Sequence, residues 1–158
     1  SCQLLNYYGF DITPEEANKF IDNCFIYDEI AENLGFIWHV ENNKTEQISK
    51  IMERFINDVA GTIIVKLQYV DEIELKMLLN KHPVILATDF TASGHYILAK
   101  TLEDTIENTV VIVNDSYGKF NVDSKKYESK NGENCQISFD RLLQFLKKDG
   151  TKKYRVIG

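Results

Sequence analysis

The spacing of apolar residues changes at Gly61, and this change constrains the fold more than any other feature of the chain. After Gly61, short β-branched and apolar runs predict strands at residues 62–69, 83–89, 95–103, 109–115 and 153–157. Before it, residues 45–60 have the periodicity of a helix with one buried stripe, formed by Ile48, Ile51, Met52, Phe55, Ile56 and Val59. Helices followed by strands joined through short turns indicate an α+β fold with an antiparallel sheet.

Start and stop signals predict further helices on both sides of this boundary. Residues 1–8 resemble the end of a helix that stops at Gly9, and Thr13-Pro14-Glu15-Glu16 is a capping box that opens a helix to about Cys24. Others are expected over residues 27–34, from Asp71 to Asn80, and from Ser138 to Lys148.

Length and charge restrict the classes of protein that the chain can belong to. With 158 residues, a single domain covering residues 1–158 is expected, and it can bury a core without disulfides. The net charge of -6 and the lack of a basic patch with interleaved aromatics argue against a nucleic-acid partner. The apolar runs are too short to span a bilayer. We also expect the protein to be a monomer. No signal peptide is visible, which leaves cytoplasmic and released locations open.

The cysteines Cys2, Cys24 and Cys135 are odd in number and widely spaced, which argues against a disulfide framework. No CxxC pair, HExxH motif or carboxylate–histidine cluster indicates a metal site. We therefore expect no metal and no cofactor, and the thiols are either buried or catalytic.

The predicted hairpin between residues 95 and 115 carries the main candidate for chemistry. His95 opens its first strand and Asp115 closes its second, and each is ten residues from Thr105 at the turn. Residues equidistant from the turn of an antiparallel pair face each other, so His95 and Asp115 should lie side by side. A slip of one residue would bring Asn114 opposite His95 instead. Gly94 leaves room for a substrate backbone close to His95.

Simpler interpretations exist for each of these residues. A histidine at the start of a strand is more often a surface residue. An aspartate before Ser116-Tyr117-Gly118 is also typical of a turn, because it bonds to its own following backbone. Asp89 either lines a cleft near His95 or caps the loop at residues 90–94, and Tyr117 either joins an aromatic rim, with Trp38, or is buried.

Motifs along the chain resemble one family in their order and spacing. Pro83-Val84-Ile85-Leu86, Gly94-His95-Tyr96-Ile97-Leu98 and Val111-Ile112-Val113-Asn114-Asp115-Ser116-Tyr117-Gly118 are similar to the papain-like cysteine peptidases of the bacteriocin-processing type. This group cleaves double-glycine leader peptides and includes stand-alone bacterial and phage relatives that cut peptidoglycan. The resemblance implies a papain-like fold and a Cys-His-Asp triad with His95 and Asp115 as two members. Ser116 replaces the usual proline of the family's turn.

The nucleophile is where the chain departs from the family. Leu4-Leu5-Asn6-Tyr7-Tyr8-Gly9 resembles the end of the family's nucleophile helix, whose cysteine lies about ten residues before this element. The start of that helix is therefore expected to be missing. Cys2 is a later helix position, which leaves Cys2 as the candidate within the chain and a cysteine upstream of Ser1 as the alternative. At a helix start, the dipole would lower the pKa of such a thiol.

Two hypotheses of different class follow. The first is a cysteine peptidase that cleaves cell-wall (peptidoglycan) peptides or a leader peptide. The second is a degenerate papain-like module that holds a peptide but lacks the nucleophile. An effector toxin that uses the same triad on a host protein is a weaker third.

Overall fold

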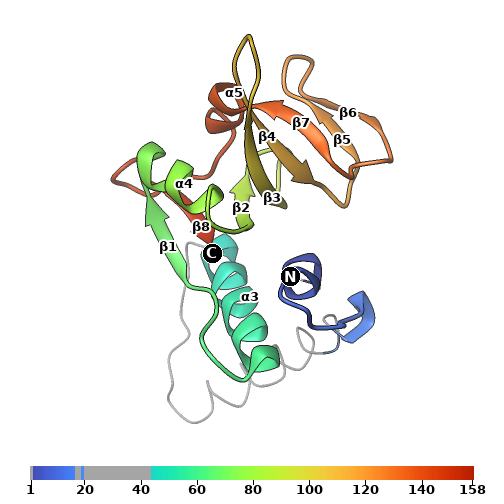
Figure 1. Ribbon diagram of the computed structural model, residues 1–158, viewed down its shortest axis with the longest axis vertical. Coiled ribbons are helices and arrows are strands. Elements are labelled where there is room, and N and C mark those ends of the chain that lie inside the picture. Colours follow the sequence, from blue (N-terminus) through green and yellow to red (C-terminus); the bar gives the residue numbers. More distant parts are fainter. Residues whose placement is uncertain (1, 17–18, 20–43) are drawn as a thin grey trace. The chain divides into compact units, whose positions relative to one another are not determined.

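The computed structural model describes residues 2–16, 19 and 44–158, apart from the side chains of Cys2 and residues 44–48. The chain divides into two compact units, Ser1–Lys66 and Leu67–Gly158 (Figure 1). The single domain expected over residues 1–158 stays a prediction, and the helix expected at residues 27–34 lies outside the described residues.

Within the described residues of the first unit, helices α1 and α3 have bounds that agree with the sequence patterns. Helix α1 spans Cys2–Tyr7 and is followed by a turn at Gly9, whose φ of 86° suits a residue without a side chain. Helix α3 spans Lys44–Ala60 and is followed by Gly61 at a φ of 66°. Between them, Thr13 and Glu16 form the predicted capping box, in which each side chain accepts from the other residue's backbone N–H. Along α3, the buried side chains include Met52, Phe55 and Ile56, as the stripe predicted.

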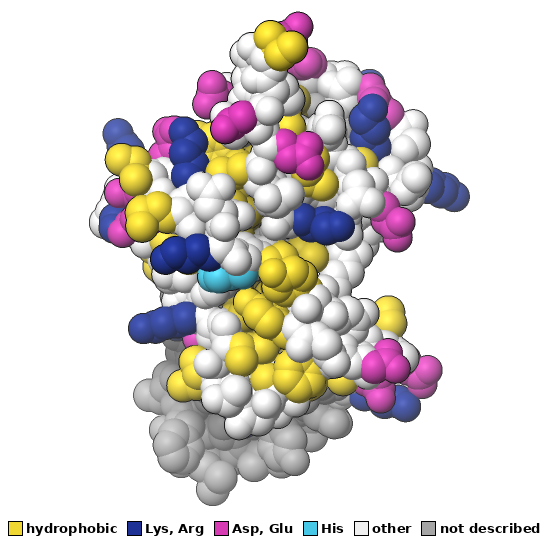
Figure 2. Space-filling view, viewed as in Figure 1, with side chains coloured by type: hydrophobic (Ala, Val, Ile, Leu, Met, Phe, Trp, Pro, Cys, Tyr) yellow, Lys and Arg dark blue, Asp and Glu magenta, His cyan; other side chains and the backbone are white. Residues whose placement is uncertain are grey.

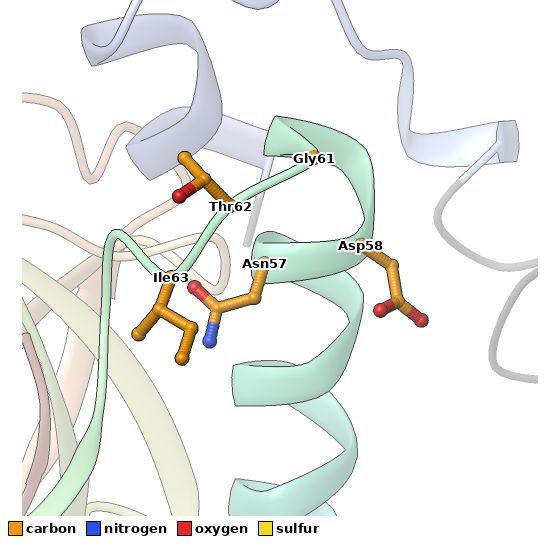
Figure 3. Close-up of a pocket in the computed structure, with 5 residues that line it drawn as sticks. All are labelled: Asn57, Asp58, Gly61, Thr62 and Ile63. Carbon is orange, nitrogen blue, oxygen red and sulfur yellow. The ribbon is translucent and has the colours of Figure 1, made fainter.

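A strand was expected to begin at Thr62, but strand β1 spans only Leu67–Val70. The side chain of Asn57 explains the difference, because it takes up the backbone groups that a neighbouring strand would otherwise bind. Its Oδ1 accepts from Ile64 N (2.9 Å) and Val65 N (3.1 Å), and its Nδ2 donates to Val65 O (2.9 Å). Figure 3 shows Asn57 pointing toward the segment after Gly61, whereas Asp58 points away from it.

The second unit is built on a six-stranded antiparallel sheet in the order β1-β8-β2-β3-β4-β7. Besides β1, its strands are β2 (Val84–Thr88), β3 (His95–Asp104), β4 (Thr109–Asn114), β7 (Cys135–Ser138) and β8 (Tyr154–Ile157). A separate two-stranded sheet is formed by β5 (Lys119–Asn121) and β6 (Lys126–Ser129). With helices and an antiparallel sheet in one chain, the α+β class is confirmed, and the arrangement is compatible with a papain-like fold.

Two helices complete the second unit and share one buried cluster with the sheet. Helix α4 spans Glu72–Leu79 and begins with the predicted capping box between Asp71 and Glu74. Helix α5 spans only Phe139–Leu143. The shared core includes Leu75 and Leu79 of α4, Phe139 and Leu142 of α5, and the strand residues Val84, Leu86, Ile97, Val111 and Val156. Burial of this apolar area is the main force that holds the unit together.

Helix α5 is shorter than expected, because the residues after it pair with strands. Ser138 makes no side-chain hydrogen bond as a cap, and the helix was predicted to reach Lys148. Instead, Lys147 N donates to Ala87 O (2.8 Å), and Lys147 O accepts from Arg155 N (3.0 Å). The backbone groups of this segment are therefore satisfied by β2 and β8 rather than by another helical turn.

The register of the β3–β4 hairpin differs from the prediction. Asp104 pairs with Thr109 and Leu98 pairs with Asn114, with a bulge between Ala99 and Thr101. The turn is therefore centred after Thr105, and His95 is not the direct cross-strand partner of Asp115. The cross-strand partner of His95 is Thr88 on β2. The bulge adds a residue to β3, which shifts the pairing at this end of the hairpin.

Charged side chains are spread over the surface. On the face drawn in Figure 2, acidic and basic side chains are interspersed rather than gathered by sign. Within the part of the chain that the structure describes, no helix is both long and apolar enough to cross a membrane.

Candidate active site

His95 is the first residue of β3 and is held from both sides by backbone contacts. The hydroxyl of Thr88, which is fully buried, donates to His95 O (3.1 Å). Gly94 adopts a φ of 84°, and its N–H and C=O both bond to Thr91. A side chain at residue 94 would be strained in this conformation, so the glycine allows the turn that leads into β3. The imidazole of His95 is buried, with 8% of its side chain exposed.

Asp115 follows β4 directly, and its carboxylate accepts a hydrogen bond from each of its surrounding donors. Oδ1 accepts from His95 Nε2 at 2.7 Å and from Tyr117 N at 2.8 Å, and Oδ2 accepts from the hydroxyl of Tyr127 at 3.0 Å. Only 2% of the Asp115 side chain is exposed. A buried carboxylate is tolerated only when its oxygens are bonded in this way, so the cluster fixes the position of the acid.

The contact between His95 and Asp115 determines which ring nitrogen can act as a base. A carboxylate can only accept, so Nε2 of His95 must carry the proton between the two residues. Nδ1 then has a free lone pair, and among the described residues it has no hydrogen-bond partner. A histidine held in one tautomer with the other nitrogen free is suited to take a proton from a nucleophile.

The ring of Tyr117 lies on the face of His95. The ring centroids are 4.3 Å apart with an interplanar angle of 26°, while 61% of Tyr117 remains exposed. The negative face of a tyrosine ring stabilises a neighbouring cation. Tyr117 can therefore stabilise the imidazolium that forms when His95 accepts a proton. The expected place of Tyr117 in the rim of a cleft stays a prediction.

The remaining candidates near His95 have other partners. Asn114, the alternative to Asp115, accepts at Oδ1 from the backbone N–H of Asn134 (2.8 Å). Asp89 follows β2, is exposed, and forms an ion pair with Lys147. Its backbone N–H donates to Phe145 O at 2.7 Å. Neither side chain bonds to His95, although Asp89 directly follows Thr88, the cross-strand partner of His95.

Of the three cysteines, Cys135 is the one whose side chain the structure describes. Cys2 is the first residue of α1, and its side chain lies outside the described residues, as do Cys24 and Trp38. Cys135 on β7 is buried, and its thiol faces the backbone oxygens of Asn131 and Glu133. Burial raises the pKa of the Cys135 thiol above its ordinary value, which is the opposite of what a nucleophile needs.

Tyr127 bonds to Asp115, and the sequence did not indicate this contact. It lies on β6, where it is the half-buried residue of a strand whose other side chains are exposed. Its ring meets Phe120 on β5 at 5.2 Å between centroids. The only signal was one aromatic residue within the polar run Lys125-Lys126-Tyr127-Glu128-Ser129, which is too little to predict a strand.

A hollow in the first unit lacks the groups that catalysis needs. It has a volume of about 410 Å³ and is lined by Asn57, Asp58, Gly61, Thr62 and Ile63 (Figure 3). The amide of Asn57 is occupied by the backbone of residues 64 and 65, and Asp58 is paired with Arg54. Among the residues described, no group of three or more His, Cys, Asp and Glu is arranged to hold a metal ion.

A histidine bonded to a buried acid at one end of an antiparallel sheet is an arrangement that can serve as the general base of a nucleophilic hydrolase. The chain matches the model of the Peptidase_C39 like family over residues 2–142, and it belongs to that family. This membership supports cysteine peptidase activity on a peptide substrate. No curated protein and no solved structure matches the chain.

Proposed function

We propose that this protein is a cysteine peptidase in which His95 is the general base and Asp115 is the residue that orients it. One observation carries the proposal: Nε2 of His95 lies 2.7 Å from a buried carboxylate oxygen while Nδ1 has no partner among the described residues. The family match over residues 2–142 supplies the class of nucleophile, a cysteine thiol.

The reaction follows from the two ring nitrogens. Nδ1 of His95 takes the proton of the thiol, and the thiolate attacks the carbonyl carbon of the peptide bond. The tetrahedral intermediate collapses when Nδ1–H gives its proton to the leaving amine, which breaks the C–N bond and leaves a thioester. His95 then takes a proton from water, the hydroxide attacks the thioester, and the proton returns to the departing thiol. Asp115 keeps its charge throughout and stabilises the imidazolium.

Two residues are candidates for the thiol. Cys2 is the candidate within this sequence, and a cysteine before Ser1 in a longer natural chain is the alternative that the family resemblance favours. Cys135 is excluded from this role in the proposal, because its thiol is buried and its pKa is raised.

We propose cell-wall peptides as the substrate, with a double-glycine leader peptide as the alternative. The proposal depends on the resemblance of the hairpin to stand-alone members of the group that cut peptidoglycan. The exposed side chain of Tyr117 beside His95 provides an aromatic surface on which a side chain of either substrate could pack.

The test of the proposal is site-resolved alkylation of the protein with iodoacetamide across pH, read by mass spectrometry. We expect one cysteine to react rapidly below pH 7 in the wild type and to become slow in His95→Ala. His82→Ala is the matched control, because His82 is half-buried and its Nδ1 contacts the backbone oxygen of Pro83 rather than a carboxylate. Cys135 serves as an internal slow-reacting thiol.

The same variants are then assayed for hydrolysis of purified peptidoglycan and of a double-glycine leader peptide. We expect His95→Ala to lose at least about a thousandfold in kcat/KM while His82→Ala stays near the wild type. Hydrolysis retained in His95→Ala would exclude His95 as the base. If no thiol changes its rate and neither substrate is cleaved, the chain is instead a peptide-binding module.

A further inference from the structure

Tyr127 makes the one contact of Asp115 that comes from the separate β5–β6 sheet. Its hydroxyl donates to Oδ2, the carboxylate oxygen that does not face His95. Its ring also meets the edge of the His95 ring, with the centroids 6.4 Å apart and the planes at 87°. Tyr127 therefore touches both members of the pair, although it belongs to neither of the strands that carry them.

The position of the Tyr127 ring is fixed by a group of aromatic side chains. Tyr127 is the cross-strand partner of Phe120, and Phe120 stacks on Phe90 with centroids 4.0 Å apart. Phe145 packs against both phenylalanines at 5.6 and 5.7 Å. These contacts connect an otherwise exposed strand to the core of the unit, so the hydroxyl is presented to Asp115 by a rigid support.

The base of the β5–β6 hairpin is closed around Asp115 by close backbone packing. Gly132 O accepts from Asp115 N at 2.9 Å, and a Cβ at Gly132 would lie only 2.0 Å from Asp115 O. A Cβ at Gly118 would lie 1.9 Å from Ser129 O. Since no side chain fits at either position, Gly132 lies directly against the backbone of Asp115, and Gly118 lies directly against the backbone of Ser129.

We propose that Tyr127 is a positioning residue, which fixes the plane of the Asp115 carboxylate so that Oδ1 faces Nε2 of His95. The inference rests on the proposed function of the His95–Asp115 pair. The terminal torsion of an aspartate is broad, so donors on a single oxygen leave the carboxylate free to rotate. A donor on Oδ2, opposite the bonds from Tyr117 N and His95 to Oδ1, removes that freedom.

The protonation of Tyr127 is consistent with this role. Burial and the neighbouring Asp115 charge both raise the pKa of Tyr127 above its ordinary value. The phenol therefore stays neutral over the working range of a peptidase, and it always has a proton to donate.

The first experiment measures the tautomer of His95 by ¹⁵N NMR of the imidazole in the full protein, with the signal assigned through His95→Ala. We expect the wild type to hold the Nε2–H form and Tyr127→Phe to show a mixture with the Nδ1–H form. Tyr154→Phe is the matched control. Tyr154 is also half-buried and its pKa is also raised by burial, but its ring contacts Lys148 rather than Asp115.

The second experiment compares the kinetics of the same variants. We expect Tyr127→Phe to lower kcat by about tenfold with KM changed by less than about twofold, because one charge-assisted hydrogen bond is lost while the ring stays. Tyr154→Phe should stay within about twofold of the wild type.

The outcomes separate this inference from the proposed function. If Tyr127→Phe matches Tyr154→Phe in either tautomer or kcat, Tyr127 does not position the acid and the inference is overturned. If His95→Ala retains hydrolysis, the proposed function fails whatever the tautomer of Tyr127→Phe. A shifted tautomer together with a lowered kcat supports both.

Discussion

The six-stranded sheet and the β5–β6 hairpin both contribute to the surroundings of Asp115, and their strands differ in polarity and burial. Strands β2 and β4 of the main sheet are apolar and enclosed: every residue of β2 is buried, as are the four central residues of β4. The β5–β6 hairpin is polar, and Tyr127 is the half-buried residue of β6. A residue in contact with a catalytic candidate can therefore lie on a strand that the sequence pattern does not predict.

The largest effect is expected from Asp115→Ala, because Asp115 is bonded both to His95 of the main sheet and to Tyr127 of the β5–β6 hairpin. The change leaves Nε2 of His95 and the hydroxyl of Tyr127 without their acceptor. We expect kcat to fall by about a hundredfold or more and the free energy of unfolding to fall by about 1–3 kcal/mol.

The matched control for Asp115→Ala is Asn114→Ala, which removes the neighbouring polar side chain and its bond to Asn134 N. It should leave kcat within about threefold of the wild type. Peptide hydrolysis and chemical denaturation measure the two effects. Equal losses of kcat in both variants would show that the end of β4, rather than the acid, is what matters.

The His95–Asp115 contact was predicted from the sequence, but for a reason that the structure corrects. The two residues were expected to be direct cross-strand partners, whereas the observed register pairs Leu98 with Asn114. They meet because the chain turns at Asp115, where Gly132 O and Gly118 N bond to its backbone. Apolar periodicity locates strands, but a bulge and a turn held by distant residues are set by tertiary packing.

The parts of the fold that were missed share one property: their backbone partners are distant in sequence or are side chains. Strands β5, β6 and β7 were not predicted, and the segment after α5 pairs with β2 and β8 instead of continuing the helix. The capping boxes at Thr13 and Asp71 were predicted correctly, because their donors and acceptors lie within four consecutive residues. Local hydrogen bonds can be inferred from a sequence pattern, and those of Tyr127 and Gly132 cannot.

A smaller effect is expected from Gly132→Ala, which tests whether the hairpin is held by backbone packing. The new Cβ would lie 2.0 Å from Asp115 O and 2.8 Å from Gly118 O, and both are backbone atoms that cannot rotate away. We expect a loss of about 2–3 kcal/mol in the free energy of unfolding, measured by denaturant titration.

Gly150→Ala is the control for this substitution, since nothing lies within 4 Å of a Cβ at that exposed position. Its free energy of unfolding should change by less than about 0.5 kcal/mol. If Gly132→Ala were as stable as Gly150→Ala, the loop at the base of the hairpin could relax, and close packing would not be what holds it to Asp115.

The smallest expected effect concerns the free energy of unfolding at alkaline pH, where the contact between Tyr127 of the β5–β6 hairpin and Asp115 should weaken. The pKa of Tyr127 is raised in the folded protein, chiefly by burial and then by the Asp115 charge, from an ordinary value of 10.0. Above pH 10 the unfolded chain therefore loses the Tyr127 proton before the folded chain does, and stability falls as the pH rises. Because Tyr127 is only half-buried, its share of the slope of unfolding free energy against pH should be below about 1.4 kcal/mol per pH unit.

Urea titrations between pH 9 and 11.5 should show a shallower alkaline loss of stability in Tyr127→Phe than in the wild type. Tyr154→Phe removes a phenol whose pKa is raised by burial and by Glu72, so it measures how much of the loss is common to half-buried tyrosines. A loss in Tyr127→Phe that equals the wild-type loss would mean that the Asp115 charge does not act on this hydroxyl, and that the hairpin is electrostatically independent of the sheet.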